Sequence, residues 1–394
     1  MKTALLHYWL TNLRGGEKVF AALCELLPEA DVFTHALGAG MRDGHGRPED
    51  AAPRENGRMP PGCATIWGHP VRESWIAKLP MGRRVPQAYL PLMPYAAKAL
   101  DLRAYDLIVS SESGPIIGVA KRTGQRHVCY CHSPMRYVWD MYDRYYAAAG
   151  RGEKIAMKIF RKHLRYHDLK SAESVDRFVA NSRFVAERIK RIYGRDSAVV
   201  HPPVDVEFFR GRGSGVAGLA SPPFEPGSYY LWSGELRAYK RPDIAVEACA
   251  RTGRKLVVIG RGGMRETLEK RTAAEGGIKF LGRVSDEVLK AAYANAKALL
   301  FPGVEDFGIV PVEAQAAGTP VIALGKGGAL DSVIPGVTGL FYDDESVEGL
   351  CGAIEEFEGC GGFDSDACRK NADRFAKAEF ISKMQAMISS LSKS

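Results

Sequence analysis

The most informative stretch of this sequence is Phe301-Pro-Gly-Val-Glu305-Asp306-Phe307-Gly308-Ile309-Val-Pro311-Val-Glu313-Ala-Gln-Ala-Ala-Gly318-Thr-Pro320. Residues 299–301 close an apolar run that is typical of a buried strand. Pro311 has the fixed φ that suits the first position of a helix, and Gly318 with the proline that follows forms a typical helix exit. The stretch therefore predicts a strand, a loop, a short helix and a second strand over 321–324. Glu313 is expected in the first turn of that helix.

Two carboxylates, Glu305 and Glu313, stand eight positions apart at the mouth of this segment. The free N–H groups and the positive dipole end of a helix attract phosphate, and Gly308 lets the backbone approach a ligand closely. Carboxylates cannot hold phosphate, but they accept hydrogen bonds from vicinal hydroxyls. A nucleotide sugar, with hydroxyls at both ends and phosphates between them, would satisfy both features. The alternative is that Glu313 only complements the helix dipole and that Glu305 is a solvated loop acid.

The Glu305-x7-Glu313 pattern resembles the nucleotide-sugar motif of retaining glycosyltransferases with the GT-B fold, specifically glycosyltransferase family 4. The Glu-Asp-Phe-Gly form is similar to that of bacterial mannosyltransferases that use GDP-mannose. The resemblance implies that Glu305 and the backbone of Phe307 and Gly308 meet the transferred sugar, and that Glu313 binds the ribose. The implied donor-binding residues of this stretch are Glu305, Asp306, Phe307, Gly308, Ile309 and Glu313.

A chain of 394 residues is long enough for two domains, and its composition, 46% hydrophobic and 25% charged, is ordinary for a globular protein. The clearest break in composition is a cluster of Gly, Ser and Pro over 211–227. The resemblance implies an α/β protein of the GT-B type, with two Rossmann-like domains facing each other across a cleft. The expected parts are an acceptor-binding domain over 1–205, a linker over 206–228, a nucleotide-sugar-binding domain over 229–374, and a C-terminal helix over 375–394 that joins the first domain.

Two stretches of the first domain add to the predicted site. Gly15-Gly16 opens a helix after the first strand, where glycine amides can meet a ligand or merely form a tight turn. The Gly-Gly-Glu-Lys-Val sequence resembles the first loop of the family, which implies contact with the donor diphosphate. His132 follows a predicted strand over 127–131, and the run that it begins resembles the His-containing turn of the family. The resemblance implies that His132 contacts the transferred hexose. The implied acceptor-side residues are Arg136, Tyr137 and Trp139.

Cations and glycines of the second domain complete the predicted donor site. Lys240 and Arg237 lie in a basic loop before a helix that starts near Pro242, where cations would stabilise a diphosphate leaving group. The family usually carries Arg one residue after Gly234, but here that residue is Glu235, so Arg237 is expected to take its place. Two further loops resemble the base-binding loops of the family in order and spacing, and they contribute Gly260, Gly262, Arg283 and Val284.

The resemblance implies a reaction that transfers a hexose, with mannose from GDP-mannose as the expected donor, to a lipid-linked saccharide with retention. The resemblance implies catalytic roles for Glu305, His132 and Lys240. No side chain is placed as a covalent nucleophile, so front-face displacement is expected. We expect no cofactor and no metal, because the Asp-x-Asp sequence at 364–366 precedes a helix as a cap. The rival interpretations are a non-catalytic nucleotide-sugar-binding partner, a transferase that uses UDP-glucose or another donor, and a phosphorylase or epimerase of the same fold.

The formal charge of +8 is unevenly distributed. Residues 1–210 carry 32 Lys and Arg against 22 Asp and Glu, whereas the rest of the chain carries 22 against 24. A basic first half without a nucleic-acid-binding module predicts an anionic membrane surface or a lipid diphosphate as partner, and not nucleic acid. With no signal peptide and no apolar run of 18 residues, a cytoplasmic protein is expected, peripheral on the inner face of the cytoplasmic membrane. Residues 38–63 form a polar insertion to which no function is assigned.

Overall fold

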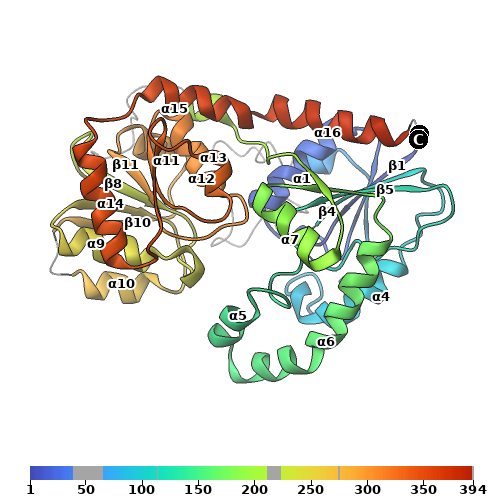
Figure 1. The fold of residues 1–394 in the computed structure, drawn as a ribbon. Helices are drawn as coiled ribbons and strands as arrows, with labels where there is room; N and C mark the ends of the chain where they lie inside the picture. The colour runs from blue at the N-terminus through green and yellow to red at the C-terminus, as the bar shows by residue number, and fades with distance from the viewer. Residues whose placement is uncertain (39–64, 113, 211–222, 274–275, 393–394) are drawn as a thin grey trace. The chain divides into compact units, whose positions relative to one another are not determined.

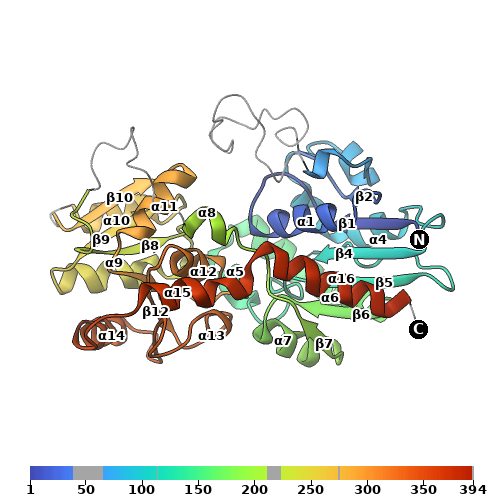
Figure 2. The same cartoon turned by 90° about the horizontal axis from the view of Figure 1, so that it is seen from above.

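The computed structural model describes residues 1–38, 65–112, 114–210, 223–273 and 276–392. Almost all of the polar insertion over 38–63, and most of the Gly, Ser and Pro cluster over 211–227, lie outside these ranges. The chain separates into two compact units (Figure 1 and Figure 2). Unit 1 is Met1–Pro203 with Phe380–Ser394, and unit 2 is Val204–Glu379.

Unit 1 has a parallel sheet of seven strands in its described residues, in the order β3-β2-β1-β4-β5-β6-β7. These strands are β1 (Thr3–His7), β2 (Asp31–Thr34), β3 (Val71–Glu73), β4 (Leu107–Glu112), β5 (Arg126–Cys131), β6 (Arg177–Ala180) and β7 (Ser197–Val199). The central strands are runs of buried side chains, because helices cover both faces of a parallel sheet. The helices are α1 (Gly15–Leu26), η1 (Trp75–Lys78), η2 (Pro86–Leu92), α4 (Met93–Lys98), α5 (Tyr142–Ala148), α6 (Arg151–Glu173), α7 (Arg183–Tyr193) and the C-terminal helix α16 (Lys377–Ser392).

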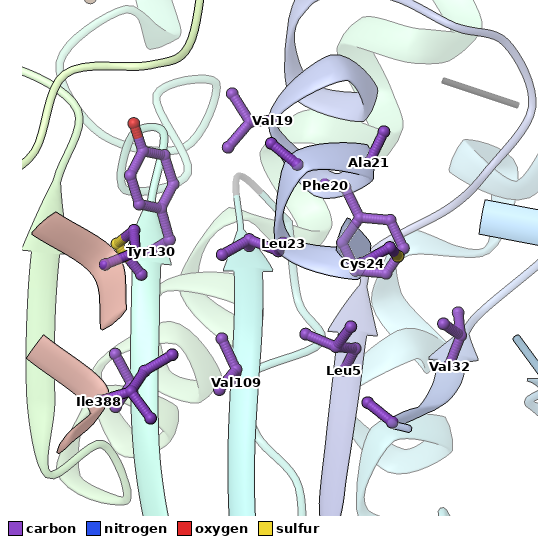
Figure 3. Packing of buried hydrophobic residues seen from close by; sticks show 14 of the residues in the cluster. Leu5, Val19, Phe20, Ala21, Leu23, Cys24, Val32, Val109, Tyr130 and Ile388 are labelled. Carbon is purple, nitrogen blue, oxygen red and sulfur yellow. The ribbon is translucent and has the colours of Figure 1, made fainter. Parts of the chain in front are cut away.

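The two faces of this sheet have separate cores. α1 and α16 cover one face, and Figure 3 shows Phe20 of α1 and Ile388 of α16 among the side chains that pack there with Leu5, Val109 and Tyr130 of the strands. α4, α6 and α7 contribute to the opposite face. The apolar side of the C-terminal helix is therefore part of the core of unit 1.

Unit 2 has a parallel sheet of six strands in its described residues, in the order β10-β9-β8-β11-β12-β13. They are β8 (Tyr229–Ser233), β9 (Lys255–Ile259), β10 (Ile278–Gly282), β11 (Ala298–Phe301), β12 (Val321–Leu324) and β13 (Gly339–Tyr342). α8, α11, α12 and α15 contribute to the core on one face, and α9 and α14 to the core on the other. The helices are α8 (Val206–Arg210), η3 (Ala238–Lys240), α9 (Pro242–Arg251), α10 (Arg265–Arg271), α11 (Asp286–Ala294), α12 (Ile309–Ala316), α13 (Ala329–Ser332), α14 (Val347–Gly359), α15 (Ser365–Ala372) and η4 (Asp373–Phe375).

The predicted fold class is confirmed, because both units are α/β with wholly parallel sheets. The predicted strand over 321–324 is β12, and the predicted helix start at Pro242 is the start of α9. Among the described helices, none combines the length and the apolar character that a membrane span requires.

The strand order reverses beside the first strand of each unit. β1 lies between β2 and β4 in unit 1, and β8 lies between β9 and β11 in unit 2. The loops that leave such neighbouring strands turn in opposite directions and open a crevice at the carboxyl ends, where α/β proteins bind ligands. The residues at these ends are His7 and Glu112 in unit 1, and Ser233 and Phe301 in unit 2.

Candidate functional site

Three loops meet at the carboxyl edge of the sheet in unit 2, after β8, β11 and β12. Glycines allow the close contact between them. A Cβ on Gly303 would lie 2.7 Å from the Cα of Lys240, and a Cβ on Gly328 would lie 2.2 Å from the Cα of Phe307. The N–H of Gly328 also donates to the carbonyl of Glu305 at 2.9 Å. These contacts fix the loop after β11, which carries the first acid of the motif.

The helix that follows this loop, α12, begins two residues earlier than predicted. Gly308 has a φ of +82° and precedes Ile309, so Pro311 occupies the third helical position, where an N–H would have no partner within the helix. Gly308 adopts this φ without strain because it lacks a Cβ. The prediction that Glu313 lies in the first turn is therefore wrong, and Glu313 lies in the second turn.

Glu313 is a buried carboxylate, 8% exposed. The hydroxyl of Tyr293, which belongs to α11, donates to Oε2 of Glu313 at 3.1 Å. Burial raises the pKa of Tyr293 well above its ordinary value, and the charge of Glu313 raises it further, so Tyr293 remains a hydrogen-bond donor. The alternative interpretation, in which Glu313 only complements the helix dipole, is disfavoured, because Glu313 is buried in the second turn and accepts a hydrogen bond from Tyr293.

Lys240 and Glu305 form an ion pair in which Nζ and Oε1 are 2.7 Å apart. Their side chains are only 15% and 19% exposed. Burial acts to lower the pKa of Lys240, but the charge and hydrogen bond of Glu305, together with Tyr239 and Glu235, outweigh it, so the pKa is raised and Lys240 is charged. The resemblance assigned these two residues to different parts of the donor, and the structure places them against each other.

The turn after Lys240 is strained. Arg241 has a φ of +51°, in the left-handed region that non-glycine residues rarely occupy, at a typical cost of about 1 to 3 kcal/mol. Its side chain pairs with Asp243 at 3.2 Å in the first turn of α9. Lys240 lies close to Gly234. A Cβ placed on Gly234 would lie 3.5 Å from Nζ of Lys240.

Glu235, which stands where the family usually has Arg, pairs with Arg237 at 2.9 Å. The Arg237 side chain is 60% exposed, so the pair is screened by water and contributes little to stability. Arg237 could exchange this partner for a phosphate at small cost. Its role as a substitute for the family arginine stays a prediction.

Gly260 and Gly262 have a packing role in the structure. A Cβ on Gly260 would lie 1.7 Å from the carbonyl oxygen of Gly234, and a Cβ on Gly262 would lie 2.4 Å from that of Leu236. The loops after β8 and β9 therefore pack closely against each other. This packing alone requires glycine at both positions, whether or not a ligand binds there. Their part in donor binding stays a prediction.

The remaining predicted donor residues lie at the same edge of the sheet. Arg283 is exposed and Val284 is half-buried, directly after β10. Phe307 is 3% exposed and its ring belongs to the core of unit 2, so its backbone is the part that can face a ligand. Asp306 and Ile309 are half-buried beside it.

In unit 1 several residues meet at the carboxyl ends of β1, β4 and β5. Nε2 of His132 lies 2.8 Å from Oγ of Ser111 at the end of β4. A Cβ on Gly16 would lie 3.7 Å from that Nε2 and 3.2 Å from the hydroxyl of Tyr8. Gly15 and Gly16 occupy the first two positions of α1, whose N–H groups have no partner within the helix. The structure thus brings His132 and the glycine pair together.

His132 is neutral at physiological pH. Burial lowers its pKa to about 3, and the nearby His7 adds to the shift. The backbone carbonyl of His132 accepts a hydrogen bond from Nδ2 of Asn181, at the end of β6, at 3.0 Å. The sequence marks Asn181 with Ser182 only as a helix-capping signal after a strand, and Ser182 is the residue that caps α7.

Two further titratable residues, His7 and Glu17, lie under the glycine pair. Nε2 of His7 and Oε1 of Glu17 are 4.0 Å apart, and both side chains are buried. Oε2 of Glu17 also accepts a hydrogen bond from the N–H of Arg14 at 2.9 Å. Glu17 therefore caps the start of α1 and lies close to the end of β1.

The acceptor-side residues rest on α6. Nε1 of Trp139 donates to the Asp168 carboxylate at 2.6 Å, and the hydroxyl of Tyr193 donates to the same group at 3.0 Å. Burial raises the pKa of Asp168 to about 7, and these two hydrogen bonds act against the rise. Tyr137 and Trp139 pack against a small apolar cluster that includes one residue of α6, and Arg136 is half-buried. Whether this segment binds an acceptor stays a prediction.

The described ranges contain no group of three or more His, Cys, Asp and Glu that could hold a metal ion. Asp364 accepts a hydrogen bond from the N–H of Asp366 at 2.9 Å, at the start of α15. The prediction that this Asp-x-Asp sequence is a helix cap is confirmed.

Comparison with known proteins agrees with this architecture. The two parallel sheets are those of a GT-B protein, as solved structures with the same arrangement show. Residues 13–208 match the model of Glycosyltransferase Family 4, and residues 220–375 match that of Glycosyl transferases group 1. The chain belongs to the glycosyltransferases that combine these two domains.

The curated relatives are similar over part of their length. The D-inositol 3-phosphate glycosyltransferase of Streptomyces bingchenggensis is 36% identical over 191 residues, which are 42% of this chain and 42% of that protein. The protein of the same name from Kribbella flavida is 30% identical over 203 residues, 46% of this chain and 48% of its own. The match thus spans less than half of either relative. Neither is named as a mannosyltransferase, so the mannosyl part of the resemblance stays a prediction.

Solved structures are similar over nearly the whole chain. HepE of Anabaena, solved in complex with UDP-glucose, has a TM-score of 0.66 and 18% identity, and the match covers 99% of this chain and 100% of that one. Sucrose-phosphate synthase of Thermosynechococcus elongatus has a TM-score of 0.71 and 19% identity, and the match covers 99% of each chain. At these identities the likeness shows the fold alone.

Proposed function

We propose that this protein transfers a hexose from a nucleotide sugar to a lipid-linked saccharide, with retention of the anomeric configuration. GDP-mannose is the proposed donor, and the proposed setting is the synthesis of a cell-surface polysaccharide, O-antigen or exopolysaccharide. The observation that carries the proposal is the carboxyl edge of unit 2. There the buried acid Glu313 and the ion pair of Lys240 with Glu305 lie at the strand-order reversal.

The nucleotide end of the donor is proposed to bind at Glu313. A carboxylate can accept hydrogen bonds from both hydroxyls of a ribose, and a charged acceptor makes these bonds strong. Tyr293 holds Glu313 in place, so little side-chain entropy is lost when the ribose binds.

The diphosphate is proposed to bind Lys240 and Arg237. A phosphate next to Lys240 competes with Glu305 for the ammonium group, so donor binding would release the Glu305 carboxylate to the hydroxyls of the sugar. The amides of Gly15 and Gly16, at a helix N-terminus, are proposed to bind phosphate as well.

The transfer itself is proposed to be a front-face displacement. The bond from the anomeric carbon to the diphosphate oxygen breaks, and a bond from the acceptor oxygen to that carbon forms on the same face. The acceptor proton passes to the departing diphosphate. Lys240 stabilises the negative charge of the diphosphate as it develops, which is where a fixed cation contributes most to rate.

His132 is proposed to contact the hexose. Because burial keeps its pKa at about 3, the imidazole meets the sugar as a neutral group and exchanges hydrogen bonds with hydroxyls. Arg136, Tyr137 and Trp139 are proposed to lie on the acceptor side. The basic first half of the chain supports an anionic, lipid-linked acceptor and a peripheral position on the inner face of the cytoplasmic membrane.

A second candidate is transfer from a UDP-sugar to a small phosphorylated acceptor. Its support is the name of the curated relatives, which refers to D-inositol 3-phosphate, and the UDP-glucose bound to the HepE structure. A third is a non-catalytic partner that binds nucleotide sugars, and Glu235 in the place of the family arginine favours it.

One incubation separates these candidates. Purified protein would be mixed with radiolabelled GDP-mannose, UDP-glucose or other nucleotide sugars, and with either total membrane lipid or D-inositol 3-phosphate. Label that moves from GDP-mannose into lipid supports the proposal. Label from UDP-glucose, or label in the inositol phosphate, would replace it with the second candidate. Nucleotide binding without transfer from any donor would favour the non-catalytic partner.

A further inference from the structure

The first half of α6 lies away from the sheet of unit 1, together with α5 (Figure 1). α6 has 23 residues, and its buried residues are Leu164, Asp168 and Ala172, all in its second half. Large apolar side chains nevertheless occur along its whole length. Five of them are exposed: Ile155, Ile159, Phe160, Tyr166 and Leu169.

Four of these five residues fall on one side of the helix. Ile155, Ile159, Tyr166 and Leu169 stand at positions i, i+4, i+11 and i+14, which lie on one face at 3.6 residues per turn. Their exposed fractions are 61%, 64%, 59% and 40%. We call this face the outer stripe of α6. An apolar helical stripe normally packs on a core, and this one is open to solvent in the described structure.

The basic side chains of α6 divide into two groups. The guanidinium of Arg161 lies 3.7 Å from the ring centroid of Tyr142 and donates to the carbonyl of Val138 at 3.2 Å. Arg165 likewise lies 3.9 Å from the ring of Trp139. Both arginines therefore pack toward α5 and the acceptor-side segment. The exposed lysines of the helix are Lys158, Lys162 and Lys170. Lys162, at i+7 from Ile155, lies on the outer stripe itself, and Nζ of Lys158 lies 5.4 Å from the ring centroid of Tyr146 in α5.

Only one of the three acids of α6, Glu173, pairs with one of these lysines. The helix carries seven basic and three acidic residues. Glu153 accepts a hydrogen bond from the N–H of Gly150 at 2.9 Å, Asp168 is buried, and Glu173 pairs with Lys170 at 3.2 Å. Exposed apolar side chains with lysines on and beside the same face are the arrangement of a helix that lies in a membrane interface, where the lysine stems pack along apolar surface and their ammonium groups reach the phosphates.

We propose that the outer stripe of α6 inserts into the headgroup region of an anionic bilayer. This deepens the proposed function, on which it rests for the lipid-linked acceptor. A protein partner is less favoured, because the flexible, strongly hydrated lysines are depleted from protein interfaces and suit lipid phosphates.

The same helix holds the acceptor-side segment. Arg161 binds the carbonyl of Val138, and Asp168 binds the indole of Trp139. A bilayer that contacts the outer stripe therefore lies against the element on which residues 136–139 rest. The inference is that α6 positions this segment at the surface from which a lipid-linked acceptor is taken.

Vesicle flotation tests the contact. The full chain would be mixed with phosphatidylcholine vesicles that contain or lack phosphatidylglycerol, at low salt and at about 0.5 M salt. We expect binding that needs the anionic lipid. Ile155→Ser with Ile159→Ser should lower it by about tenfold or more through lost apolar burial. Lys158→Gln with Lys162→Gln should lower vesicle binding by about fivefold per lysine at low salt. At high salt the same substitutions should change vesicle binding little.

The matched control is Leu330→Ser with Val337→Ser, which changes two exposed apolar side chains of unit 2. It should leave flotation unchanged, and circular dichroism and thermal unfolding equal to those of the wild type would show that the α6 variants fold. Flotation of the Ile155→Ser, Ile159→Ser variant equal to that of the wild type would overturn the inference. So would equal binding to neutral vesicles, or self-association through the stripe without any vesicle binding. Flotation that behaves as expected, without transfer to any lipid, would instead defeat the proposed function.

Discussion

The two sheet edges that carry the candidate site differ in their electrostatics. At the edge of unit 2 the polar groups are charged and paired: Lys240 with Glu305 at 2.7 Å, and Arg237 with Glu235 at 2.9 Å. At the edge of unit 1 the central group is His132, whose pKa burial lowers to about 3. One edge therefore presents charge, and the other presents a neutral imidazole.

This difference matches the two chemical parts of a nucleotide sugar. A diphosphate is an anion whose charge grows as it departs, and fixed cations stabilise it. A hexose is uncharged, and neutral donors and acceptors bind its hydroxyls without the desolvation cost of a buried ion. If the two edges have these roles, substitutions at the charged edge should have larger effects than substitutions at the neutral edge.

The largest effect is expected from Lys240→Ala. It removes the cation at the leaving group, and steady-state transfer should slow by about 100-fold or more. Lys297→Ala is the matched control, because Lys297 also pairs with a glutamate, Glu358 at 3.0 Å, but precedes β11 at the opposite end of the strand. Equal rates for the two variants would remove Lys240 from the mechanism.

A smaller effect is expected from His132→Asn. Loss of a neutral hydrogen bond, about 0.5 to 1.5 kcal/mol, should slow transfer by about threefold to tenfold. A histidine with a pKa of about 3 is neutral at every pH above that value, so the ratio of wild-type to variant rates should stay constant between pH 5 and 8. A ratio that changes through pH 6 to 7 would mean that His132 titrates there and that the neutral edge is misassigned.

The smallest effect is expected from metal removal. Glu305 is engaged by Lys240, Glu313 by Tyr293, and Asp364 caps α15. Transfer should survive excess EDTA, and Asp364→Ala with Asp366→Ala should leave the rate nearly unchanged while costing about 1 kcal/mol of stability through the lost cap. If EDTA abolishes transfer and manganese restores it, the proposed donor chemistry is wrong although the fold is right.

The local signals in the sequence predict the elements well. Pro242 predicts the start of a helix, and the apolar run over 321–324 predicts a strand. Both predictions are confirmed. The turn of Glu313 is predicted wrongly, because the left-handed φ of Gly308 lets the helix begin before the proline. A proline therefore indicates the first turn of a helix, but it does not show which position of that turn it occupies.

The contacts between loops cannot be predicted from local signals. The pairing of Lys240 with Glu305, and the hydrogen bond from Tyr293 to Glu313, join residues 65 and 20 positions apart. The close approach of Gly328 to Phe307 depends on the order of the strands, and its only sequence signal is the glycine pair before α13. The inward orientation of Arg161 on α6 likewise depends on the aromatic residues packed against it.

Nucleotide binding by Glu313 variants tests the charged edge most directly. Calorimetry would compare GDP and UDP binding by the wild type, by Glu313→Gln, and by Glu356→Gln, which changes an exposed glutamate of α14. Loss of a charged acceptor in a buried network should weaken nucleotide binding by about 1 to 3 kcal/mol in Glu313→Gln, and the control should bind as the wild type does. Unchanged affinity of Glu313→Gln for both nucleotides would contradict the assignment of this edge to the donor.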